Sequence, residues 1–133
     1  MGERLYLDAS VLISILARED DWLVYSQRLD RSEASFTSAI SMLEAVIRLS
    51  AILRVEPITA KAELDALLRR ARVEVLAVTD RTAAIAVDAF TRYGKGRHQT
   101  RLNLGDCFSY ACAKQHRLTL LYKGDDFAMT DIV

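Results

Sequence analysis

The stretch RLYLDASVLISILARE, residues 4–19, changes its hydrophobic pattern at a single acidic residue, Asp8. Before Asp8 lies a short apolar run rich in β-forming residues. After it, apolar residues recur at helical spacing from Val11 to Leu16. The pattern predicts a buried strand that runs directly into a helix, with a carboxylate at the junction.

The same alternation of strands and helices continues along the chain. The remaining predicted strands are 33–38, 73–78 and 118–122. The predicted helices are 10–19, 20–30, 39–54, 59–71, 80–94 and 104–116, with Ser38, Thr59 and Asn103 as possible N-caps. Strands joined by helical crossovers form parallel sheets with helices on both faces. We therefore expect one α/β domain over residues 1–133, with a central parallel sheet of four to five strands.

The composition is that of an ordinary globular protein, with 51% hydrophobic and 27% charged residues. Lysine plus arginine equal aspartate plus glutamate at 18 each, so any binding of nucleic acid must come from a local basic patch. The chain has no signal-peptide pattern and no apolar run of membrane-spanning length, which predicts a cytoplasmic protein. Cys107 and Cys112 match no metal or redox spacing and are expected to be buried, reduced thiols.

Several acids follow the predicted strands. Asp8 ends the first strand, and Asp125 and Asp126 follow the fourth. Because ligands of open parallel sheets bind at the carboxyl ends of the strands, these acids are expected at one rim. Asp8 could equally serve as the N-cap of the helix that begins beside it.

Glu44 interrupts an apolar stripe on the predicted helix 39–54. The stripe consists of Ile40, Leu43, Ile47 and Ala51, and we expect it to face the core. A lone buried carboxylate is costly unless it is paired or bound to a metal. Glu44 is thus either a metal ligand, a half-exposed residue at the edge of the stripe, or the partner of Arg48.

Asp106 has a strong structural alternative. With Asn103 as N-cap, it is the third residue of its helix, where a carboxylate favours the helix dipole and bonds back to the cap. On a helical wheel it lies opposite the apolar residues Leu104, Phe108, Ala111 and Cys112, so the pattern does not force it inward. Taken alone, Asp106 is predicted to be a capping residue.

Four acids around one rim would repel one another and need a cation to be stable together. Carboxylates and waters are the ligands of Mg²⁺ and Mn²⁺, which also hold phosphate groups. Such ions activate water and stabilise the leaving oxygen of a phosphodiester. The acid set therefore points to nuclease chemistry.

Four quoted motifs carry a family resemblance over the whole chain: YLDASVL, SAISMLEAV, YGKGRHQTRLNLGDCFSYACAK and LLYKGDDFAMTDI. Together they resemble a PIN domain of the VapC type, the toxin half of bacterial toxin–antitoxin pairs. The resemblance implies an endoribonuclease dependent on Mg²⁺ or Mn²⁺, a homodimer, and inhibition by a small DNA-binding antitoxin similar to VapB.

The resemblance also assigns residues. It places Asp8, Glu44, Asp106 and Asp126 at the metal, with Asp125 as the second choice for the fourth acid. Ser10 matches the small hydroxyl residue that assists the first acid.

A basic loop precedes Asp106. Lys95, Arg97, His98 and Arg101 are the candidates for RNA phosphate contacts, although such a loop could also be merely solvated. Two rival functions remain at this stage. One is a catalytically inactive PIN-like module that binds RNA or protein, and the other is a receiver-like domain phosphorylated at a strand-end aspartate.

Overall fold

Four parallel strands form the centre of the computed structural model, which describes residues 2–96 and 100–132. The strands are β1 (Arg4–Leu7), β2 (Ala34–Ser38), β3 (Val73–Leu76) and β4 (Thr119–Leu121). Their spatial order is β3-β2-β1-β4, and Leu5 of β1 pairs with Ser35 on one side and Thr119 on the other. The predicted parallel sheet is confirmed, with four strands.

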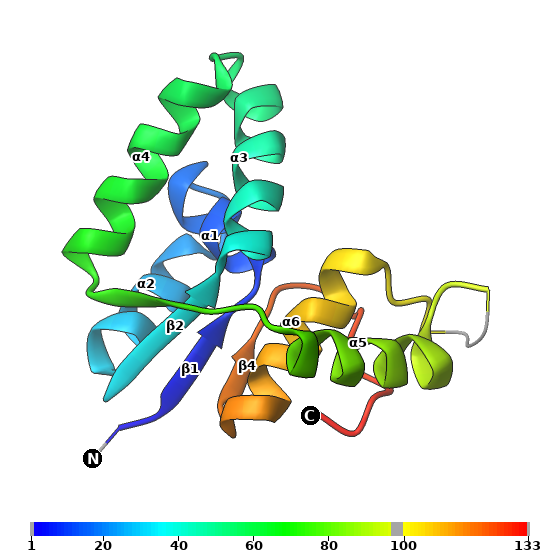
Figure 1. The fold of residues 1–133 in the computed structure, drawn as a ribbon. Coiled ribbons are helices and arrows are strands. Elements are labelled where there is room, and N and C mark those ends of the chain that lie inside the picture. The colour runs from blue at the N-terminus through cyan, green and yellow to red at the C-terminus, as the bar shows by residue number, and fades with distance from the viewer. Residues whose placement is uncertain (1, 97–99, 133) are drawn as a thin grey trace.

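Six helices in the described part of the chain cover both faces of the sheet, as predicted. They are α1 (Ala9–Leu16), α2 (Trp22–Arg31), α3 (Ala39–Leu53), α4 (Pro57–Arg70), α5 (Asp80–Tyr93) and α6 (Leu104–His116). Figure 1 shows α3 and α4 as an antiparallel pair on one side, with α5 and α6 together on the other. Among the described residues, no helix is long and apolar enough to cross a membrane.

Alternating side chains of β1 separate the two halves of the core. Leu5 and Leu7 pack with residues of α1 to α4, whereas Tyr6 packs with residues of α5 and α6. Both cysteines are free and buried in the second half. The strand alternation thus fixes which helices lie on which face.

Two predicted N-caps differ in the structure. Ser38 occupies the N-cap position of α3 as predicted, but its hydroxyl bonds to the Tyr6 hydroxyl at 2.8 Å and makes no capping hydrogen bond. Helix α4 begins at Pro57, so the predicted start at Thr59 is wrong. Proline is favoured at the first helical position because its φ is preset and its missing N–H has no partner there.

The predicted inward stripe of α3 is also wrong. Leu43 and Ile47 are 61% and 57% exposed, and the buried residues are instead Ser41, Ala45, Val46 and Leu49. Helix α3 has apolar residues on both sides, and the side that packs on the rest of the fold is the one with smaller residues. Glu44 lies between these two sides and is half-buried.

The connections create a switch point beside β1. From β1 the chain moves outward to β2 and β3, then returns to β4 on the opposite side of β1. In such sheets the loops separate at the carboxyl ends of the strands, which leaves a crevice for a ligand. Asp8 directly follows β1 and lies at this edge.

Candidate metal centre

A hollow of about 550 Å³ lies at this edge and is lined by Asp8, Glu44, Asp106 and Asp126. The four acids come from the end of β1, from α3, from the first turn of α6 and from the segment after β4. The sequence-predicted acids are therefore brought to one place by four separate segments. The other polar residues that line the hollow are Ser10, Glu19, Arg48, Asn103 and Lys123.

Hydroxyl groups hold both carboxylate oxygens of the buried Asp8. Ser109 of α6 donates to Oδ1 at 2.6 Å. Ser10 donates to Oδ2 through its hydroxyl at 2.6 Å and its backbone N–H at 3.1 Å. The backbone bond makes Asp8 the N-cap of α1, so the capping interpretation is confirmed and fixes the direction of the carboxylate.

Behind Ser109 a chain of buried hydroxyls leads into the core. The hydroxyls of Ser109 and Ser41 lie 3.4 Å apart, and Ser41 lies 2.8 Å from the hydroxyl of Tyr6. Burial raises the pKa of the Tyr6 phenol, so this group stays protonated. The chain links Asp8 to α3 and α6 through neutral groups only.

Asp106 forms the predicted capping box with Asn103. Its carboxylate accepts the Asn103 N–H at 3.1 Å, and the Asn103 side chain accepts the Asp106 N–H at 2.9 Å. The wheel, which gave no reason for Asp106 to point inward, misleads here, because Asp106 is 8% exposed whereas Leu104 is 73% exposed. Helix α6 is enclosed by the sheet, α3 and α5, so small residues on nearly every side are buried.

The environment of Asp106 favours its neutral form. Burial raises the pKa of Asp106 to about 7, as do the charges of Asp126 and Asp8, although the Asn103 N–H works against them. A nearby cation would strongly stabilise the ionised form of such a carboxyl group.

Glu44 experiences the same repulsion. Burial, then the charges of Asp8 and Asp106, raise the pKa of Glu44 to about 7. Arg48 lines the same hollow but forms no ion pair with Glu44 in the described structure, so the proposed pairing is not seen. Glu44 is thus a half-buried acid surrounded chiefly by other acids.

The segment after β4 brings the fourth acid and a lysine. Asp125 and Asp126 are both exposed, but only Asp126 of the two lines the hollow. The Lys123 N–H donates to the Ser10 hydroxyl at 2.9 Å, which ties this segment to Asp8. The Lys123 ammonium pairs with Glu19 at 2.8 Å and Asp21 at 3.1 Å.

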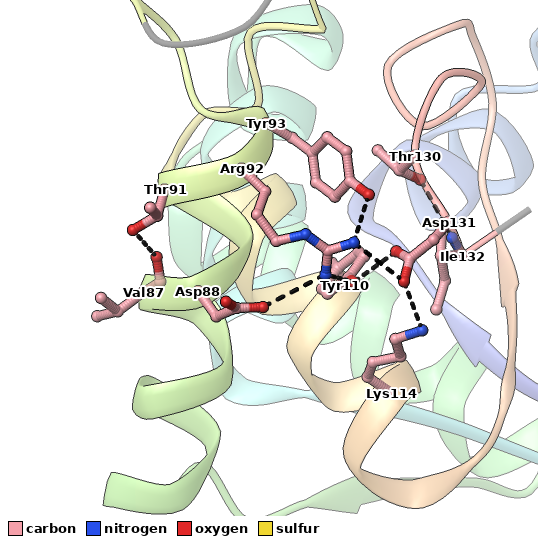
Figure 2. A network of polar contacts seen from close by, with 10 residues as sticks. All are labelled: Val87, Asp88, Thr91, Arg92, Tyr93, Tyr110, Lys114, Thr130, Asp131 and Ile132. Atoms are coloured by element: carbon pink, nitrogen blue, oxygen red, sulfur yellow. Dashed lines mark hydrogen bonds and ion pairs between the residues drawn. The ribbon is translucent and has the colours of Figure 1, made fainter.

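A charged network anchors the end of the same segment (Figure 2). Asp131 accepts hydrogen bonds from Tyr110 at 2.5 Å and Lys114 at 2.9 Å, and pairs with Arg92 at 3.4 Å. Burial opposes ionisation of Asp131, but these donors and charges outweigh it and lower its pKa to about 2. The network joins the C-terminal segment to α5 and α6.

The basic loop starts and ends near α6. Gly94 and Leu102 form a bridge, and the Lys95 N–H donates to the Leu102 carbonyl at 3.0 Å. Lys95 and Arg101 are exposed on either side of this bridge, next to the Asn103 cap. The other two predicted RNA contacts, Arg97 and His98, lie outside the described residues.

The donor set suits a hard divalent cation. The four acids offer only oxygen, the preference of Mg²⁺ and Mn²⁺, and Mg²⁺ keeps several waters while binding one or two carboxylates. Within residues 2–96 and 100–132, no three or more histidine, cysteine, aspartate or glutamate side chains are arranged so that they could together hold a metal ion. A hollow ringed by carboxylates fits a partly hydrated ion better than a fully dehydrated one.

Sequence reasoning missed Ser109, Lys123 and Gly105 as parts of the site. Ser109 lies three residues after Asp106, so the two side chains share one side of α6, which was a readable signal. Lys123 comes two residues after β4, at the same edge of the sheet where Asp8 follows β1. Gly105 lies directly against the Glu44 carboxyl group. No sequence signal indicates this contact, because it depends on how α3 and α6 approach each other.

Comparison with known proteins gives a consistent result. Residues 5–133 match the PIN domain. A VapC ribonuclease of Mycolicibacterium smegmatis is 40% identical over 128 residues, covering 96% of this chain and 97% of the relative. Ribonuclease VapC30 of Mycobacterium tuberculosis is 39% identical over 128 residues, covering 96% of this chain and 95% of the relative.

Two solved structures share the fold. VapC20 of Mycobacterium tuberculosis, described as a toxin that cleaves the sarcin-ricin loop, superposes with a TM-score of 0.74 at 19% identity and covers 97% of this chain and 96% of its own. A toxin–antitoxin complex of Klebsiella pneumoniae gives 0.68 at 21% identity, with coverage of 97% and 94%. At these identities the similarity shows only that the fold is shared.

Proposed function

Because this chain belongs to the PIN domain family and, within it, to the VapC ribonucleases, we propose that it is a metal-dependent endoribonuclease and the toxin of a toxin–antitoxin pair. The observation that carries the proposal is the meeting of Asp8, Glu44, Asp106 and Asp126 at one hollow. The family supplies the reaction class, and the hollow supplies the place for it.

The four acids would hold one or two Mg²⁺ or Mn²⁺ ions. When bound, such a cation supplies an activated water and neutralises charge on the scissile phosphate. The protein's part is to hold the carboxylates in place: Ser109 and Ser10 donate hydrogen bonds to Asp8, and the Asn103 N–H donates one to Asp106. No side chain has to act as a covalent nucleophile.

RNA is the expected substrate, and the basic loop is its expected contact. Lys95 and Arg101, with Arg97 and His98 in the same loop, form a local basic cluster in a chain whose net charge is zero. Phosphates held there would approach the hollow from the side of Asn103.

A second copy and an antitoxin are the proposed partners. The exposed apolar residues Leu43 and Ile47 of α3 support a homodimer, since large apolar groups clustered on a surface usually meet a partner. The acidic hollow supports a small VapB-like antitoxin that inserts an arginine there. The sequence pattern of the second predicted helix offers Trp22, Leu23 and Tyr25 as contacts for the antitoxin or the dimer, with at least two of them expected in the core. In α2, Trp22 and Tyr25 are half-buried and Leu23 is 54% exposed.

The decisive assay incubates the purified chain with total RNA in Mg²⁺ or Mn²⁺ and sequences the cut ends, with EDTA as control. Cleavage that EDTA abolishes supports the proposal. Tight RNA binding with no cleavage in either metal would favour the catalytically inactive binding module instead. Cleavage that persists in EDTA would contradict metal dependence.

A further inference from the structure

Gly105 is the second residue of α6, between the Asn103 cap and Asp106. A Cβ atom built at this position would overlap with Cδ and both Oε atoms of Glu44. The Glu44 carboxyl group therefore fills the space that a side chain at Gly105 would occupy.

Backbone conformation does not require glycine here. The glycines with positive φ in the described chain are Gly96 and Gly124, so Gly105 has backbone angles open to any residue. In a helix alanine is favoured over glycine. What glycine provides at this position is room, and the group that uses the room is a carboxylate of the hollow.

The contact also decides which atoms would move. Glu44 reaches α6 from α3 with the end of a flexible side chain, whereas Gly105 is part of the backbone of a buried helix. An added methyl group is therefore relieved by rotation of the Glu44 side chain, and its carboxylate leaves the hollow while the helices stay in place.

We propose that Gly105 is a positioning residue that admits the Glu44 carboxylate to the metal site, an inference that rests on the proposed function. It predicts an unusual pair of effects for Gly105→Ala: weaker cation binding together with undiminished stability of the metal-free chain. If Gly105 were needed only for the fold, Gly105→Ala would instead destabilise the metal-free chain and leave cation affinity unchanged.

The test is calorimetric titration of the EDTA-treated full chain with Mn²⁺. Gly105→Ala is expected to lower Mn²⁺ affinity about 10- to 100-fold, the range for changes that misplace metal ligands, and to match Glu44→Gln. The double variant should bind no more weakly than Glu44→Gln alone. Leu104→Ala, on the exposed side of the same helical turn, is the matched control and should bind like wild type.

Unchanged affinity in Gly105→Ala beside weakened affinity in Glu44→Gln would overturn the inference, as would further weakening in the double variant. If the wild-type chain binds no Mn²⁺, that result counts against the proposed function. Two measurements on the metal-free chain still test the inference about Gly105. The melting temperature of Gly105→Ala should equal or exceed that of wild type. Its crystal structure should show α6 unmoved and the Glu44 carboxyl displaced; a shifted α6 with Glu44 in place would refute the inference.

Discussion

The Ser109 hydroxyl lies 2.6 Å from Oδ1 of Asp8, so a residue in the middle of α6 holds the acid at the end of β1. Ser109 also stands one turn from Asp106 on the same helix. One element thus carries one acid of the hollow and orients another. This relationship couples Asp8 and Asp106, two acids from opposite halves of the chain.

Removal of this hydroxyl should affect both stability and catalysis. In Ser109→Ala a buried carboxylate loses a donor, which costs about 1–3 kcal/mol of unfolding free energy, and a mispositioned ligand lowers cation affinity roughly 10- to 100-fold. Urea unfolding and RNA cleavage at varied Mg²⁺ measure the two effects. Ser50→Ala, which removes an exposed hydroxyl on α3, is the control and should change neither. Wild-type cleavage by Ser109→Ala would contradict the role given to its hydroxyl.

The metal-free chain should lose stability as pH rises from about 5 to 7. Glu44 and Asp106 have pKa values raised to about 7 from ordinary values of 4.5 and 3.8, so in this interval the folded state binds more protons than the unfolded state. Unfolding free energy then falls with rising pH and levels off above pH 7. Melting temperatures in EDTA between pH 5 and 8 measure the effect.

Three changes should each flatten this pH dependence. Glu44→Gln and Asp106→Asn each remove one of the titrating carboxyl groups, and saturating Mg²⁺ favours the ionised form of both. If the EDTA-treated wild-type chain instead became more stable between pH 5 and 7, the mutual repulsion of the acids would not be the dominant effect at the hollow.

The C-terminal network is expected to stabilise the fold. Asp131→Asn removes the charge that Tyr110, Lys114 and Arg92 share, and should cost about 1 kcal/mol, because these groups are partly exposed. Since the pKa of Asp131 is lowered to about 2, the wild-type chain keeps this contribution above about pH 4 and loses it as pH falls toward 2.

Urea titration at pH 7 and pH 3 tests this account of Asp131. Asp88→Asn, which breaks only an exposed pair with Arg92 at 3.4 Å, serves as the comparison and should cost less. Equal losses in the two variants would show that the network adds nothing beyond ordinary surface pairs.

Lys95 should contribute to RNA affinity without selecting sequence. In a cleavage-deficient Asp8→Asn background, Lys95→Ala is expected to weaken binding of unrelated RNAs to a similar extent. It should also reduce the slope of log affinity against log salt by about 1. Fluorescence anisotropy at several salt concentrations measures both. Lys61→Ala on α4, paired with Asp65, is the control; an equal effect there would remove the basic loop as a specific contact.

The sequence was sufficient for the order of elements and for one local detail of the site. The change of pattern at Asp8 and its repetition along the chain predict the parallel sheet, because period and chain order are local properties. The capping box of Asn103 and Asp106 is equally local, since it depends on residues three apart.

The predictions that were wrong concerned features that depend on packing between distant segments. Helix α3 is apolar on two sides, and nothing within it tells which side meets α1, α4 and α6; the stripe of Leu43 and Ile47 proved to be exposed. Asp106 is buried because α6 is enclosed on several sides, which a helical wheel cannot represent. Glu44 drew attention because it interrupts an apolar stripe, and that stripe turned out to face solvent. Glu44 nevertheless lines the hollow from the edge of the stripe.

Single-turnover cleavage of RNA as a function of Mg²⁺ concentration tests the central claim most directly. If the four acids hold the catalytic cation, wild type is inactive after EDTA treatment and regains activity with added Mg²⁺, and Asp8→Asn stays at least 100-fold slower at saturating Mg²⁺, about 2.7 kcal/mol in the barrier. Equal rates for Asp8→Asn and wild type, or cleavage that needs no divalent cation, would contradict it.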